Sequence, residues 1–406
     1  MLFTTNAHRS LKACAHSPHA RQLRQRAIER RASTLRQLRQ GRIAATTTNN
    51  NSKRQLSATS AVLATSHKSN LTNVTTATDA VTLFGAEPKC ILEPEVTQGP
   101  YYVSGELIRN DVRETQAGVD LYVELQLIDV NTCEPVQDLY VDLWHCNATG
   151  VYSGVVASGN GNSADLTNVN STFLRGLAPT DADGLVSFTT TFPGHYTSRA
   201  THIHVLGSHD GSVLANGTYA GGKAASVGQL FFDQSLIAEV EATAAYAVNT
   251  QELTLNAADK IFAEETAGEF DPVMEYALLG DSVEDGVFAW ISIGVDTTIA
   301  KSVTGAATLT ASGGVMSSTS GVSGGNGGSG MGGGSRPSAE SMGGMPPSAG
   351  SVGGDAEALA SSPSSTAGSS ATVTTPTPTP TTATPTVTSA TPTPTASSVS
   401  DCVQSS

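Results

Sequence analysis

The chain of 406 residues has few aromatic residues, only 5% of its composition, and no long run of apolar residues. A helix that crosses a bilayer needs about 20 consecutive apolar residues, so we expect no transmembrane segment. The first residues also lack the apolar stretch of a secretory signal peptide, which by itself argues against secretion.

Cysteines are scarce, and their spacing does not suit a metal site. None of the five forms a Cys-X-X-Cys pair or a Cys/His zinc spacing, which argues against zinc held by thiolates. In an oxidising compartment we expect two of Cys90, Cys133 and Cys146 to pair and the third to stay free. In a reducing compartment all three would be ordinary buried thiols.

The net charge of -14 is unevenly distributed along the chain. Twelve of the 22 Lys and Arg residues precede Gln55, and Glu29 is the only acidic residue in that stretch. The remainder is therefore distinctly acidic, which is a poor basis for binding nucleic acid.

Composition divides the chain into four parts. Residues 1–54 have the pattern of a basic leader or propeptide, either an amphipathic helix or a removable segment, and residues 55–86 that of a linker. Only residues 87–298 mix aromatic, β-branched and polar residues as a packed domain requires. Residues 299–406, rich in Gly, Ser, Thr and Pro, are predicted to be a disordered tail because they cannot bury enough apolar surface.

Two features favour an extracellular or cell-wall location. The tail is typical of an O-glycosylated stalk, and six Asn-X-Ser/Thr acceptors for N-linked glycans occur. These features outweigh the missing signal peptide, so we expect a secreted glycoprotein whose true start is absent from the sequence. A mitochondrial presequence is the alternative interpretation of the basic first segment. The acceptors begin at Asn50, Asn70, Asn73, Asn147, Asn170 and Asn216.

The middle segment has the pattern of an all-β fold. Short stretches with alternating or β-branched residues are separated by Gly, Pro and Asp turns, as in an antiparallel β-sandwich with few helices. One helix is expected over about residues 235–248, where apolar residues keep helical spacing. The predicted strands cover residues 119–130, 139–145, 185–192, 201–206, 229–232 and 287–294.

His202-Ile203-His204 is the sharpest local motif. On a strand, residues two apart point to the same face, so both imidazoles project together while Ile203 and Val205 face the core. Two neutral imidazoles on one face can bind a metal ion together. The ordinary alternative for an isolated His-X-His motif is a pair of histidines on a solvent-facing strand.

Two tyrosines lie near this motif. Tyr196 is six residues before His202, and Tyr152 follows the predicted strand that contains Trp144. A phenol with a pKa near 10 is a poor ligand until it ionises, and trivalent iron supplies the charge that favours the phenolate. From the residues alone, Tyr152 and Tyr196 are candidate partners of the histidines; a core aromatic with a tethered hydroxyl is the alternative for either.

Six blocks resemble, in the same order, the intradiol ring-cleavage dioxygenases, most closely the extracellular fungal-type members. The resemblance extends over about residues 88–296 and implies a β-sandwich that holds one non-haem Fe(III). The blocks are TQGPYY at 97–102, VDLWHCNATGVYS at 141–153, FLRG at 173–176, TDADG at 180–184, FPGHY at 192–196 and RATHIH at 199–204.

The resemblance implies roles for individual residues. Tyr152, Tyr196, His202 and His204 would bind the iron, and a catechol-type diol would be cleaved by dioxygen between its hydroxyls to a muconate-type product. Tyr196 would leave the iron and accept a proton, and Arg199 would stabilise negative charge on the ring. Residues implied to contact the substrate are Tyr101, Tyr102, Arg175 and Gln229.

Three points stay open at this stage. The helical domain that mediates dimerisation in bacterial catechol enzymes is missing, so the oligomeric state, a dimer included, cannot be carried over. A non-catalytic cell-surface module that binds phenolic or polysaccharide material is the alternative from a different class. A cupin-type oxidase is another, but it would need a further carboxylate or histidine ligand in place of two tyrosines.

Overall fold

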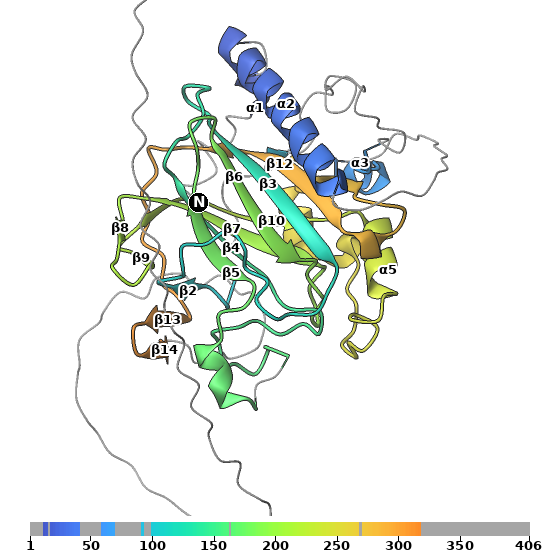
Figure 1. Cartoon of the computed structure of the whole chain (residues 1–406), viewed down its shortest axis with the longest axis vertical. Helices are drawn as coiled ribbons and strands as arrows, with labels where there is room; N and C mark the ends of the chain where they lie inside the picture. Colours follow the sequence, from blue (N-terminus) through green and yellow to red (C-terminus); the bar gives the residue numbers. More distant parts are fainter. Residues whose placement is uncertain are drawn as a thin grey trace, which may run out of the picture. The chain divides into compact units, whose positions relative to one another are not determined.

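The structure, a computed structural model, describes residues 11–14, 17–40, 58–69, 91–92, 99–161, 164–267 and 270–317. Within these ranges the fold consists mostly of β-strands with few helices, as the sequence predicts (Figure 1). The helical elements are α1 (Leu11–Cys14), α2 (Pro18–Gln40), α3 (Ala58–Ala64), η1 (Leu166–Asn170), α5 (Gln234–Glu241), η2 (Asn256–Ala258), α6 (Lys260–Glu265) and η3 (Val283–Asp285). None of the described helices is long and apolar enough to cross a membrane.

The strands form two larger and two smaller sheets. The first larger sheet has the order β10-β7-β4-β5 and is antiparallel throughout; the second has the order β1-β12-β3-β6, with β11 also paired to β12. The strands are β1 (Ile91–Leu92), β2 (Val103–Ser104), β3 (Asp120–Asp129), β4 (Tyr140–Trp144), β5 (Arg175–Pro179), β6 (Leu185–Thr191), β7 (His202–His209), β8 (Ser212–Val213), β9 (Tyr219–Ala220), β10 (Lys223–Phe231), β11 (Glu275–Leu278), β12 (Val287–Val295), β13 (Ala307–Thr310) and β14 (Gly313–Met316).

The second sheet is not wholly antiparallel, because β12 runs parallel to β3. The prediction of an antiparallel fold is wrong at this point. A long connection that includes α5 and α6 separates the two strands, and a connection of that length allows a parallel pair.

One apolar core takes alternate residues from both larger sheets. Ile203 and Val205 of β7 lie in it together with Leu121 and Val123 of β3. Burying each such aliphatic side chain stabilises the fold by roughly 1.5–3 kcal/mol. A shift of the strand by one residue would expose these side chains, so their burial fixes the register of the strand. The predicted orientation of β7 is therefore confirmed, and His202 and His204 lie on the face opposite to this core.

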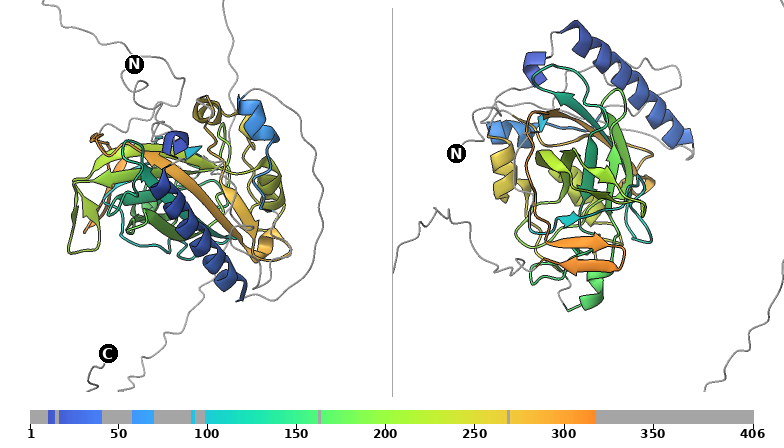
Figure 2. Two further views of the ribbon diagram at one scale, coloured as in Figure 1. Left: turned by 90° about the horizontal axis from the view of Figure 1, so that it is seen from above. Right: turned by 90° about the vertical axis from the view of Figure 1, so that its left-hand side faces the viewer.

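Residues beyond 299 are part of the described fold up to residue 317, so the prediction that the disordered tail begins at 299 is wrong there. Ala307 of β13 pairs with Val103 of β2, and β13 and β14 lie beside η1 (Figure 2). The Gly314 amide donates to the Asn170 side chain of η1 at 3.0 Å. A Cβ on Gly314 would lie 1.8 Å from the Val169 carbonyl oxygen. Small residues thus allow a close packing that composition alone does not reveal.

The basic N-terminal segment contains α2, which lies against the second larger sheet (Figures 1 and 2). Within this segment residues 18–40 are helical, and one face of the helix is buried. In the interface the Arg31 guanidinium donates to the Glu124 carboxylate at 2.9 Å, and both side chains are buried. The apolar contacts join Ile28, Ala32 and Leu35 to Phe288 and Trp290.

Cys14 and Cys133 form a disulfide, and Cys146 is a free, buried thiol. The predicted pairing among Cys90, Cys133 and Cys146 is therefore wrong in its partner, because the N-terminal segment brings Cys14 to the turn after β3. Cys90 lies outside the described residues.

Residues 58–69 pack against the β-sheet domain, although the sequence predicts a linker there. Val62 lies in one apolar cluster with Phe231, and the His67 ring lies between Asp233, at 2.5 Å, and Asp271, at 2.9 Å. Burial alone would lower the pKa of His67, but the two carboxylates outweigh it and raise this pKa to about 9.

We expect Cys133→Ser to destabilise the protein under non-reducing conditions. The disulfide joins residues 119 apart in sequence, and restricting an unfolded loop of that size stabilises the folded state by roughly 2–4 kcal/mol. Urea unfolding checks this, and peptide mapping identifies the bond. Wild-type protein and variant should coincide once reductant is added; a difference that persists in reductant would show that the disulfide is not the cause.

The pairing of His67 with Asp233 and Asp271 predicts that the protein loses stability at alkaline pH. Because the folded-state pKa of about 9 exceeds the ordinary value of 6.5, the contribution is complete below about pH 6.5 and is lost as the pH rises through 9. Its size is on the order of 3 kcal/mol. Urea midpoints across this window should fall for wild-type protein and stay flatter for His67→Gln. Parallel curves for the two proteins would contradict the assignment.

Candidate functional site

The four side chains singled out by the sequence meet at one buried point. The Nε2 atoms of His202 and His204 are 3.0 Å apart, and the hydroxyls of Tyr152 and Tyr196 lie 3.4 Å and 3.5 Å from the Nε2 atom of His202. None of the four residues is more than 7% exposed. The structure therefore brings together both histidines and both tyrosines.

A row of residues across the first larger sheet places this site. Arg175 of β5, Trp144 of β4, His204 of β7 and Gln229 of β10 are consecutive cross-strand partners. Direct partners in a sheet point to the same face, so these side chains are neighbours. From the sequence, only the family resemblance assigned Gln229 a substrate-binding role. The register of β10 against β7 now explains why Gln229 lies next to His204.

The His202 ring is fixed by a hydrogen bond. Its Nδ1 donates to the Ala200 carbonyl oxygen at 2.6 Å, which leaves the lone pair on Nε2, the atom that faces the tyrosines. Burial, and next the charge of Arg199, lower the pKa of His202 well below its usual value. The imidazole is therefore neutral at physiological pH and available as a ligand.

The His204 ring is fixed by packing instead. Trp144 stacks on it with ring centroids 4.9 Å apart and only 3° between the planes, and Nδ1 has no hydrogen-bond partner among the described residues. Gly99, at φ 76°, allows the backbone to come close, because a Cβ there would lie 2.8 Å from Cε1 of His204. Burial, and next His202, lower the pKa of His204 well below its usual value.

The two phenols are held in their protonated form by their surroundings. Burial raises the pKa of Tyr152 well above its usual value and that of Tyr196 to about 12. The turns that carry them are in close contact, since a Cβ on Gly150, at φ 81°, would lie 2.3 Å from the His195 carbonyl oxygen. Only a strong positive charge between these rings would favour phenolate.

Arg199 is directed at the same point by two partners. Its Nε donates to Asp259 at 2.8 Å and its Nη2 to Gln229 at 2.5 Å, while Nη1 lies 3.5 Å from Nε2 of His202. The buried Asp259 carboxylate also accepts from the Ala200 amide at 2.8 Å and caps α6. Neither Asp259 nor α6 was expected from the sequence, in which an Asp before a short amphipathic stretch is the signal for both.

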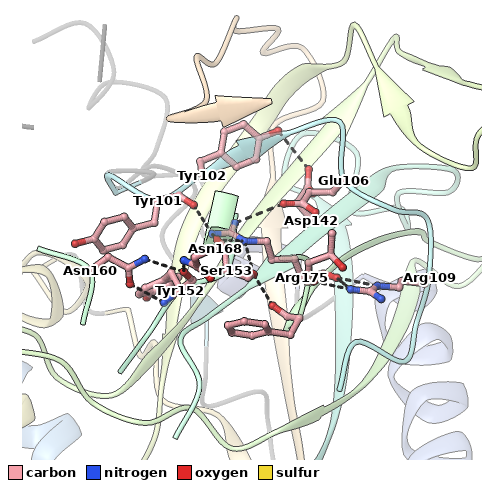
Figure 3. Close-up of polar contacts among 12 residues, drawn as sticks. Tyr101, Tyr102, Glu106, Arg109, Asp142, Tyr152, Ser153, Asn160, Asn168 and Arg175 are labelled. Carbon is pink, nitrogen blue, oxygen red and sulfur yellow. Dashed lines mark hydrogen bonds and ion pairs between the residues drawn. The ribbon is translucent and has the colours of Figure 1, made fainter. Parts of the chain in front are cut away.

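The remaining predicted residues divide into two groups. The Tyr101 ring lies 4.7 Å from that of Tyr152, and the half-buried Tyr102 ring lies 5.1 Å from that of Trp144, so both border the site. Arg175 is buried and donates to the backbone carbonyls of Tyr101 and Ser153 (Figure 3). The structure thus gives Arg175 a role in holding the backbone.

The donor atoms fit a single metal ion. Two nitrogens that are each about 2.1 Å from an ion and at right angles lie about 3.0 Å apart, which matches the separation of 3.0 Å between the histidine Nε2 atoms. Within the described residues no group of three or more His, Cys, Asp and Glu could hold a metal. The Tyr152 and Tyr196 hydroxyls are the oxygen atoms that lie beside these nitrogens, and ionised phenol oxygens would suit a trivalent ion such as Fe(III).

A β-sheet fold with a buried centre of two imidazoles and two phenols is consistent with a metal-dependent oxygenase. Residues 97–254 match the family described as Dioxygenase. A dioxygenase of known crystal structure is 30% identical over 98% of its own chain and 52% of this one, with a TM-score of 0.41. The chain therefore belongs to the dioxygenase family.

Two further solved structures are similar. An intradiol ring-cleavage dioxygenase from Tetranychus urticae is 29% identical, with 96% of that chain and 52% of this one covered and a TM-score of 0.42. Catechol 1,2-dioxygenase from Pseudomonas arvilla C-1 is 20% identical, with 62% of that chain and 50% of this one covered and a TM-score of 0.31. No curated protein matches significantly.

We expect Asp259→Asn to destabilise the protein by about 3 kcal/mol. The substitution leaves the Arg199 guanidinium without its buried counter-charge but keeps an oxygen that can cap α6. In the double variant Arg199→Met/Asp259→Asn part of the loss should be recovered, because no unpaired charge remains. Urea unfolding of the single and double variants measures this coupling, and strictly additive losses would contradict it.

Proposed function

We propose that the protein is an intradiol dioxygenase that uses non-haem Fe(III) and dioxygen to cleave catechol-type rings between their two hydroxyls. The observation that carries this proposal is that polar atoms of Tyr152, Tyr196 and His204 each lie within 3.5 Å of the His202 Nε2 atom. Family membership supports the same reaction class. We further propose that the two larger sheets form a sandwich, since one core takes side chains from both.

Ferric iron would supply the positive charge that ionises the two phenols and binds an anionic diol. Two phenolates and two neutral imidazoles would leave a net charge of about +1 at the centre, which suits such a substrate. In the metal-free site burial raises the pKa of Tyr196 to about 12, so its free phenolate is a strong base. Tyr196 is also slightly exposed, whereas Tyr152 is fully buried, so Tyr196 is the better placed of the two to accept a proton from the substrate.

The residues around the centre have separate tasks in this proposal. The Arg199 guanidinium, fixed by Asp259 and Gln229, stabilises negative charge that develops on the ring. Tyr101 and Tyr102 line the substrate pocket. Arg175 holds the backbone of Tyr101 and Ser153 beside the site.

We also propose that the protein works in an oxidising, extracellular compartment. The Cys14–Cys133 disulfide supports this, since such bonds are rare in the cytosol. The Asn-X-Ser/Thr acceptors and the Thr-Pro-rich residues of the C-terminal part are in keeping with it. Free thiols at both positions in protein from its native source would contradict this location.

Colour and oxygen uptake test the proposed function. Iron-loaded protein should absorb in the visible range through charge transfer from phenolate to Fe(III), and catechol should cause oxygen consumption. Tyr152→Phe should lose iron or colour, whereas Arg199→Ala should keep its colour and lose roughly 100- to 1,000-fold in rate. Tyr246→Phe, which removes another fully buried hydroxyl, is the control and should retain both properties.

The outcomes separate the two classes of function. Colourless iron-loaded protein would exclude the tyrosinate centre. Coloured protein that consumes no oxygen with any substituted catechol would favour the alternative, a binding module for phenolic or polysaccharide material.

A further inference from the structure

The loop that carries Tyr152 lies outside the strands, yet it is buried, so its backbone polar groups need partners. Asn160 supplies them at both ends of this residue. The Tyr152 amide donates to Oδ1 of Asn160 at 2.7 Å, and Nδ2 of Asn160 donates to the Tyr152 carbonyl oxygen at 2.7 Å (Figure 3). One side chain therefore replaces the pairing that a neighbouring strand would provide.

A second asparagine supports the same backbone. Nδ2 of Asn168 donates to the Tyr152 carbonyl oxygen at 2.8 Å, and both asparagines donate to the Val155 carbonyl oxygen, at 2.9 Å and 2.8 Å. Asn160 and Asn168 are 2% and 4% exposed. Their amides are therefore sequestered from water and committed to these carbonyls.

The residue after Tyr152 is held as well. The Ser153 carbonyl oxygen accepts from Nε of Arg175 at 3.0 Å and from Nη2 at 2.7 Å, and Nη2 also donates to the Tyr101 carbonyl oxygen (Figure 3). The loop is thus fixed on both sides of the tyrosine by buried side chains, independently of any ligand.

We propose that Asn160 and Asn168 are positioning residues for Tyr152, which keep its hydroxyl beside the His202 Nε2 atom before a metal binds. This inference rests on the proposed function, in which Tyr152 is an iron ligand. A ligand held in place loses little conformational freedom on binding, so partners behind the ligand set its affinity for the metal. The asparagines would then govern how firmly iron is kept, without touching iron or substrate.

Thr180, which directly follows β5, offers a matched control. Its buried hydroxyl accepts from the Leu139 amide at 3.0 Å and donates to the Val136 carbonyl oxygen at 2.6 Å. It follows β5, beside the start of β4, whereas Trp144 and the site lie at the other end of β4. Thr180→Val therefore removes a comparable support of buried backbone without affecting the tyrosine loop.

The experiment compares Asn160→Ala, Asn168→Ala and Thr180→Val in the full chain. Without iron, hydrogen exchange at the Tyr152 amide should become at least about tenfold faster in Asn160→Ala, because the amide loses its acceptor. In iron-loaded protein, this variant should release iron to a chelator roughly 10- to 100-fold faster and show a shifted charge-transfer band. Asn168→Ala should change in the same direction but less, since Asn160 still binds both backbone groups.

Thr180→Val should speed exchange at Leu139 and release iron at the wild-type rate. The inference would be overturned if the asparagine variants kept the wild-type release rate and absorption band. It would also be overturned if Thr180→Val released iron as fast as the asparagine variants. Either result would leave the proposed function intact. If Asn160→Ala does not fold, Asn168→Ala alone decides between these results. Colourless wild-type protein would overturn the proposed function, and this inference with it.

Discussion

The crowding of two imidazole nitrogens and two phenol oxygens around one buried point is the constraint on which the rest of the site depends. Both histidines are neutral and both phenols keep their protons in this environment, since burial disfavours every charged form. Four electron-rich atoms at such separations gain little from one another. A cation of high charge, such as the proposed Fe(III), would stabilise all four of them at once.

Such a site needs support from outside, and each donor is held by different means. A hydrogen bond to a backbone carbonyl orients His202, and stacking on Trp144 orients His204. Asparagine side chains hold the backbone of Tyr152, and the Asp259 carboxylate directs Arg199. Among the described residues Nδ1 of His204 has no hydrogen-bond partner, so the two histidines are held in different ways.

Sequence reasoning succeeded where the signal was local. Alternation along β7 predicted that His202 and His204 share a face, because a strand period of two leaves no other choice. It failed where a residue acts through a distant partner: Asp259 and Asn160 carry no motif, and their roles appear only once the chain has folded. Cys14 and residues 307–316 were misjudged for the same reason, since composition describes a segment but not the surface on which it packs.

Segments that the composition predicted to be a linker or a disordered tail nevertheless pack against residues that support the candidate site. Val62 of α3 lies in one apolar cluster with Ala200, whose carbonyl orients His202, and β14 packs on η1, which carries Asn168. Asp259 also lies beyond residues 97–254, the range of the family match. The matched region therefore contains all four proposed ligands but not everything that holds them. Rigidity at the centre is a property of the described fold as a whole, and flanking segments can tune it without any change in ligand identity.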